Sequence, residues 1–104
     1  MKEQDEVSRG RDLIIGHFAL DEKAIELAEL SYNHLEERLT SIVTNLLNKD
    51  MAKLLNALYR IDVDEKIFKE ILSHSAPNEI GRQLSREIIK RELQKVRTRA
   101  KYSD

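Results

Sequence analysis

The fold is decided by residues 21–47, DEKAIELAELSYNHLEERLTSIVTNLL. Apolar side chains recur in this stretch at alternating steps of four and three residues, a period of 3.5 that is typical of a helix with one buried face. Asp21 can cap the first turn, and Leu20 and Ile25 stand at the two positions of a hydrophobic staple. The pattern therefore predicts one long helix over about 21–47. Its apolar seam consists of Ala28, Tyr32, Leu35, Leu39, Ile42 and Leu46.

Two short helices are expected after this long one. Asp50 can cap the first of them, and an apolar stripe runs along it from Met51 to Tyr59. Either Asp62 or Asp64 can cap the second. The region between the long helix and the only proline therefore predicts two short helical segments.

A second long helix is expected at the C-terminal end. Pro77 is the only proline, and proline is tolerated in the first turn of a helix but not in its interior, so this helix is predicted at about 78–100. Three glycines and one proline leave little material for β-hairpins. The predicted fold class is all-α, a small helical bundle with two long and two short helices.

The N-terminal part has a weaker pattern. Residues 1–12 are polar and of mixed charge, without an apolar period, and are expected to form a frayed arm. The segment from Leu13 to Leu20 predicts either a short helix or an extended segment packed on the body. A chain of 104 residues buries one core but not two, so residues 21–104 are expected to form a single domain behind an N-terminal arm of residues 1–20.

The composition argues against several functional classes. The chain has no cysteine, which excludes disulfides, thiolate nucleophiles and sulfur-ligated metals. His17, His34 and His74 share no metal-ligand spacing, and the glycines and serines form neither a phosphate loop nor a nucleophile elbow. We therefore predict no enzyme, and no catalytic, metal-binding or cofactor-binding residue.

The longest apolar run is interrupted and suits neither a signal peptide nor a membrane span, so we expect a cytoplasmic protein.

Charge is divided along the length of the chain. Residues 1–81 hold 10 Lys and Arg against 16 Asp and Glu, and residues 82–101 hold 8 against 2, so the net charge of −1 is the sum of −6, +6 and the −1 of Asp104. Helical spacing gathers a face of one sign on each predicted long helix. The acidic face consists of Glu22, Glu26, Glu29, Glu36 and Glu37. The basic face consists of Arg82, Arg86, Lys90, Arg97 and Lys101.

Two interpretations of the basic face stay open. It extends about 28 Å along the helix axis, which is long enough to follow several phosphates of a nucleic acid. Alternatively, it is a solvated face, or one matched to the acidic face within a chain or between two chains. No aromatic residue interleaves with the basic positions before Tyr102, and the pI of about 6.3 is low for a DNA-binding domain. These observations favour the second interpretation.

The length of the first predicted helix favours a homodimer. At about 1.5 Å per residue, residues 21–47 reach roughly 40 Å, whereas a globule of 104 residues is about 33 Å across. The same seam can also pack on the chain's own later helices. We predict a non-enzymatic protein–protein interaction module that self-associates; the alternatives are a nucleic-acid-associated regulator and an adaptor for another protein. The seam expected in the dimer contains Tyr32, Leu35, Leu39, Ile42 and Leu46.

Two segments also carry a resemblance to other proteins. They are LLNALYRIDVDE, residues 54–65, and IIKRELQKVRTR, residues 88–99. This order resembles a group of small uncharacterised bacterial helical proteins, in which an LYRID turn precedes a short helix and then an IIxRxLQKxxTR helix. The resemblance covers residues 40–102 and implies a bacterial, cytosolic protein with a helical fold, but no activity. At the corner, Arg60 is expected to bond a carboxylate or carbonyl at the end of a neighbouring helix.

Overall fold

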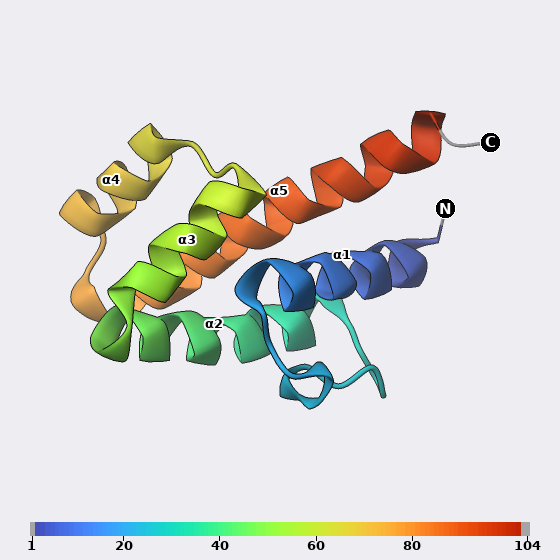
Figure 1. Ribbon diagram of the computed structural model, residues 1–104, viewed down its shortest axis with the longest axis horizontal. Helices are drawn as coiled ribbons and strands as arrows, with labels where there is room; N and C mark the ends of the chain where they lie inside the picture. Colours follow the sequence, from blue (N-terminus) through green and yellow to red (C-terminus); the bar gives the residue numbers. More distant parts are fainter. Residues whose placement is uncertain (1, 103–104) are drawn as a thin grey trace.

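Five α-helices and two single 3₁₀ turns make up the computed structural model, which describes residues 2–102 (Figure 1). No strand is present among these residues, so the predicted all-α class is confirmed. The α-helices are α1 (Glu3–Phe18), α2 (Tyr32–Lys49), α3 (Met51–Ile61), α4 (Glu65–His74) and α5 (Ile80–Tyr102). The 3₁₀ turns are η1 (Glu22–Ala24), between α1 and α2, and η2 (Pro77–Glu79), before α5.

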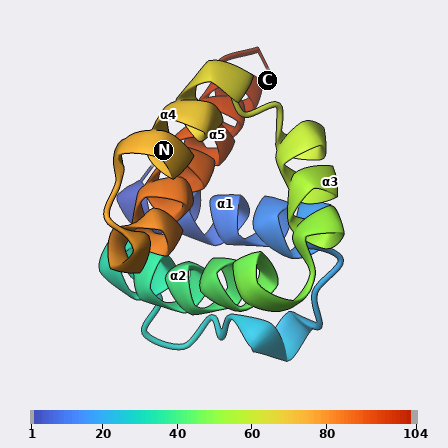
Figure 2. The same ribbon diagram turned by 90° about the vertical axis from the view of Figure 1, so that its left-hand side faces the viewer.

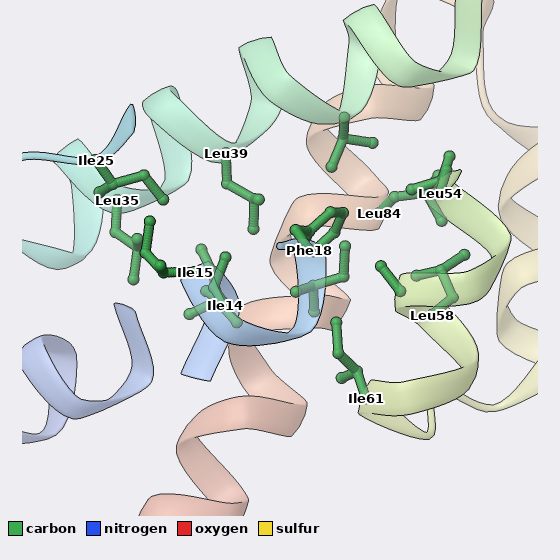
Figure 3. Close-up of a cluster of buried hydrophobic side chains, with 14 of the residues drawn as sticks. Ile14, Ile15, Phe18, Ile25, Leu35, Leu39, Leu54, Leu58, Ile61 and Leu84 are labelled. Carbon is green, nitrogen blue, oxygen red and sulfur yellow. The ribbon is translucent and has the colours of Figure 1, made fainter. Parts of the chain in front are cut away.

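The long helix α5 is the element on which the others pack. α1 and α2 lie against it, α3 contacts α1, α2 and α5, and α4 rests on α5 (Figures 1 and 2). The core fills the space where α1, α2, α3 and α5 meet, and Figure 3 shows Phe18 of α1 between side chains from α2 and α3. Burial of each large apolar side chain stabilises the fold by about 1.5–3 kcal/mol. The largest fully buried apolar side chains are Phe18, Ile14, Ile25, Leu35, Leu39, Val43, Leu54, Ile61, Leu84, Ile88 and Ile89.

Residues 3–18 form one helix, which corrects the expectation of a frayed arm over 1–12. The residues that α1 buries are Val7, Gly10, Arg11, Ile14, Ile15 and Phe18. Gly10 and Arg11 lie in the middle of this face and interrupt the apolar period that would have predicted a helix from the sequence. Gly10 lets α5 come close, because a Cβ at this position would lie 3.0 Å from Leu93 Cδ2. α1 is therefore part of the core.

The helix α2 begins at Tyr32, later than the long helix predicted over 21–47. Ser31 caps it, because its hydroxyl accepts a hydrogen bond from a backbone N–H of the first turn at 3.1 Å. Glu29 has a positive φ of 55°, which a helix cannot contain. Asp21 does act as a cap, but only for the single turn η1. The local cap at Ser31 therefore decides where the helix begins.

Arg11 fixes the linker between α1 and α2. Its buried guanidinium donates to the carbonyl oxygen of Ile25 at 2.8 Å, and to both the carbonyl oxygen and the carboxylate of Glu22. Ile25 and Leu30 of the linker are themselves buried. The linker over residues 19–31 is thus held to the body by Arg11, by its own apolar side chains, and by Arg38 of α2, which donates to the carbonyl oxygen of Ala24 at 3.2 Å.

The ends of the later helices follow local signals. Asp50 caps α3 and Asp64 caps α4, each by accepting a backbone N–H of the first turn, at 3.1 and 2.8 Å. Asp62, the other candidate, instead ends α3 with a positive φ of 68°. Pro77 lies in η2, and α5 follows at Ile80, close to the predicted start at about 78. These boundaries were predictable because each depends on residues within one turn.

Candidate functional site

The seam predicted for self-association lies inside the chain's own core. Leu35 and Leu39 are fully buried, Leu46 is buried, and Tyr32 and Ile42 pack on the core as partly buried side chains. A second copy would reach the three leucines only if the chain opened, so only Tyr32 and Ile42 of this seam remain partly accessible. With 18 residues, α2 is about 27 Å long and fits within a molecule whose longest extent is 41 Å. Its length therefore requires no second copy.

Acidic residues of the same chain match much of the basic face of α5. Arg82 Nη1 lies 2.8 Å, and Arg86 Nε 2.9 Å, from the two carboxylate oxygens of Glu36 on α2. Arg97 Nε lies 2.8 Å from a carboxylate oxygen of Glu6 on α1. These pairs support the interpretation in which the basic face is matched within the chain. The other two members of the face, Lys90 and Lys101, are exposed on α5.

Glu36 is the centre of the contact between α2 and α5. Burial alone raises the pKa of its carboxyl, but the hydrogen bonds and charges of Arg86 and Arg82 outweigh burial and hold the pKa of Glu36 below its usual value. The carboxylate is therefore ionised at neutral pH. Close by, Gly81 lets the two helices approach, because a Cβ there would collide with Thr44 Oγ1.

The acidic residues expected on one helix face are dispersed. Glu22 lies in η1, and Glu26 and Glu29 lie in the linker before α2. Only Glu36 and Glu37 are on α2, and Glu36 is buried against α5. The prediction of a continuous acidic face is therefore wrong, for the same reason that α2 begins late.

Three large apolar side chains form an exposed row on α3. Met51, Leu55 and Tyr59 are spaced four residues apart and lie along one side of the helix. They are 40, 44 and 85% exposed. The core uses other positions of α3, namely Leu54, Ala57, Leu58 and Ile61. α3 is therefore apolar over more of its circumference than the core covers, and we refer to these three exposed side chains as the α3 row.

A hollow of about 670 Å³ continues the α3 row beyond Tyr59. It lies at the corner between α3 and α4, and α5 contributes charged and polar side chains to its lining. Tyr59, Val63 and Ile67 supply its apolar lining. Arg91 of α5 reaches the corner and donates to the carbonyl oxygen and the carboxylate of Asp62, each at 3.3 Å. The hollow thus joins an apolar surface to a rim that carries both signs of charge.

The helix α4 leaves this region open. None of its residues is buried, and its main packing partner is α5 rather than α3 (Figure 2). Its apolar side chains Ile67, Phe68 and Ile71 are only partly buried. Because α4 turns toward α5, it does not cover the α3 row.

A hydrogen bond to a buried carboxylate, which the sequence does not signal, joins α1 and α5. His17 Nδ1 lies 3.0 Å from Glu92 Oε2, and Lys95 Nζ lies 3.3 Å from the other carboxylate oxygen. Glu92 is fully buried. His17 and Glu92 are 75 positions apart, so no local spacing signals the pair. The cluster supplies partners to a carboxylate that would otherwise be buried alone, which is a structural role.

Within residues 2–102, no group of three or more His, Asp or Glu side chains is placed to hold a metal ion. None of the helices described is long and apolar enough to cross a membrane.

No protein-family model, curated protein or solved structure matches the chain. The resemblance to small bacterial helical proteins therefore stays a prediction, and the α3 row with its hollow is the candidate site on which a function can be argued.

Proposed function

We propose that this protein is a non-enzymatic helical module that self-associates, with the α3 row as the surface that a second copy covers. The row itself carries the proposal, because Met51, Leu55 and Tyr59 are adjacent on one helix and all substantially exposed. Single exposed apolar residues are ordinary on a monomer, but a contiguous group of them is typical of an interaction surface. Tyrosine and methionine are also enriched in protein interfaces.

The energetics favour a contact of modest strength. Full burial of a large apolar side chain contributes about 1.5–3 kcal/mol, and less where the side chain is already half covered. Association costs at least about 4 kcal/mol in lost translational and rotational freedom. A dimer buries this row on both copies, and six partly exposed side chains contribute about 5–10 kcal/mol, which exceeds the lower end of this cost by a small margin. The hollow beside Tyr59 adds contact area. We expect a dimer whose population rises with protein concentration.

The charge around the site supports a second copy as the partner. The net charge of the chain is −1, so two copies repel one another little. The rim of the hollow carries Asp62, Asp64 and Glu65 on the side of α3 and α4, and Glu87, Lys90 and Arg91 on α5. A rim with both signs of charge presents like charges to any strongly acidic or strongly basic partner, whereas a second copy, with its net charge of −1, brings both signs.

Placing a charge in the middle of the row tests the proposal. In Leu55→Glu, association would bury an unpaired carboxylate, so we expect this variant to remain at 12.1 kDa when the wild type gains mass. Leu27→Glu is the matched control, because Leu27 is 55% exposed but lies in the linker between α1 and α2. Light scattering on a sizing column measures both. A folded Leu55→Glu protein that keeps the mass of the wild type would contradict the proposal.

Binding of nucleic acid through α5 is the less supported alternative. A phosphate would have to compete with Glu36 for Arg82 and Arg86, and with Glu6 for Arg97. Any such binding should weaken steeply as salt concentration rises.

A further inference from the structure

We infer that α3 pairs in the antiparallel direction with α3 of a second copy, across a two-fold axis that passes beside Leu55. This inference rests on the proposed self-association and adds the contacting helix, its direction and its register. In this arrangement Leu55 meets Leu55 of the second copy, and Met51 meets Tyr59 on both sides of the axis. Such an interface is isologous, since each contact away from the axis occurs twice.

The register follows from the symmetry of the α3 row. Leu55 stands four residues after Met51 and four residues before Tyr59, so the two outer side chains lie about 6 Å from the centre along the helix axis. A half-turn about Leu55 exchanges the two ends of the row. Each methionine then faces a tyrosine, and the contact of a thioether with an aromatic ring is favourable. The row is therefore complementary to itself in this one register.

Charge favours the antiparallel over the parallel direction. The C-terminal end of α3 carries the exposed Arg60 and leads into a corner with exposed Asp62, Asp64 and Glu65, of which Asp62 is contacted by Arg91 and Asp64 caps α4. The N-terminal end has exposed Lys49, and the carboxylate of Asp50 there is occupied in capping the helix. Antiparallel pairing sets Lys49 of the second copy toward these carboxylates and opposes the two helix dipoles. Parallel pairing would align the two dipoles.

The hollow provides room for the end of the second helix. Tyr59 belongs both to the α3 row and to the lining of the hollow. The residue that meets Tyr59 in this register is Met51 of the second copy, so its flexible side chain lies at the edge of the hollow. Val63 and Ile67 then extend the apolar contact beyond α3. The hollow is thus partly filled by the partner in each half of the dimer.

Single introduced cysteines test the register, because the chain has no cysteine of its own. Leu55→Cys should form a disulfide-linked dimer under mild oxidation, since both copies of this position lie at the axis and within the short separation that a disulfide needs. Asn56→Cys is the matched control. Asn56 is also exposed on α3 but lies about 100° further round the helix, so it should stay unlinked.

A mixture of two further variants tests the direction. Met51→Cys and Tyr59→Cys, one of them carrying a size tag, should cross-link to each other and not to themselves. Parallel pairing would give the converse result, in which each variant links to its own copy.

The outcomes separate this inference from the proposed function. If the wild type gains mass with concentration but Leu55→Cys links no better than Asn56→Cys, self-association stands and this register is overturned. Self-linking of Met51→Cys or Tyr59→Cys overturns the antiparallel direction. A wild-type protein that stays at 12.1 kDa at every concentration, with no cross-link in any variant, overturns both.

Discussion

Glu36 is the residue on which the contact between α2 and α5 depends most. Each of its carboxylate oxygens takes a separate arginine, Arg82 or Arg86. The buried carboxylate of Glu36 therefore partly balances the charges of both arginines, which the sequence predicted as members of the basic face. This local pairing is the reason that the charge division along the chain does not translate into an equally strong basic surface.

Replacing Glu36 by glutamine should destabilise the protein most at neutral pH. Burial raises the pKa of Glu36, but Arg86 and Arg82 outweigh burial and hold the pKa below its usual value. The charged form therefore stabilises the fold above the usual pKa, and this stabilisation is lost as the pH falls through the lower folded-state pKa. We expect Glu36→Gln to lower the free energy of unfolding by about 1–2 kcal/mol at pH 7, because both arginines are partly solvated.

Urea unfolding at pH 7, 5 and 3 measures this effect, and the difference between Glu36→Gln and the wild type should shrink toward pH 3. Glu37→Gln is the control, because Glu37 is the exposed neighbour on the same helix. A difference that is equally large at all three pH values would show that charge is not its cause.

Residue roles were predictable where they depend on near neighbours. Asp50 was predicted as a cap, and Asp64 as one of two candidate caps, because a cap acts within one turn. A cation bonding the end of a helix at the corner was also expected, but the sequence suggested Arg60, whereas Arg91 makes this bond to Asp62. The choice between the two arginines depends on where α5 crosses the corner, which local spacing does not record.

The element that the sequence predicted least well is α1. Its buried face includes Gly10 and Arg11, and both residues act through contacts with distant parts of the chain. Gly10 leaves room for Leu93 of α5, and Arg11 donates a hydrogen bond to the carbonyl oxygen of Ile25 in the linker. A glycine and a charged residue in a buried face lower the apolar signal that identifies a helix. The start of α2 was predicted too early for the opposite reason. The apolar period extends back to residue 21, but the cap at Ser31 excludes the residues before Tyr32 from the helix.

The docking of α1 on α5 should depend on His17. Removing its imidazole in His17→Ala leaves the buried carboxylate of Glu92 with Lys95 as its remaining side-chain contact. A buried polar group that loses a hydrogen-bond partner costs about 1–3 kcal/mol. We therefore expect the free energy of unfolding, measured by thermal and urea unfolding, to fall by this amount. His74→Ala, at an exposed position of α4, is the control and should change stability little. A His17→Ala protein as stable as this control would show that the pair does not hold α1.

At the scale of the whole molecule, most of the apolar seam of α2 packs in the core, and a contiguous row of exposed apolar side chains is left on α3. The sequence contained the relevant stripe from Met51 to Tyr59 but not which part of it stays exposed. Exposure is set by α4, which turns onto α5 and leaves the α3 row open. The hollow was likewise not predictable, because residues from α3, α4 and α5 line it together only in the folded chain.

The molar mass of the wild-type protein in solution tests the central claim most directly. We would measure it by light scattering over a wide range of protein concentrations, at low and at high salt. Burial of an apolar row predicts a mass that rises from 12.1 kDa toward twice that value with concentration, at both salts, because apolar contacts are not screened. A mass that stays at 12.1 kDa throughout would contradict self-association through the α3 row.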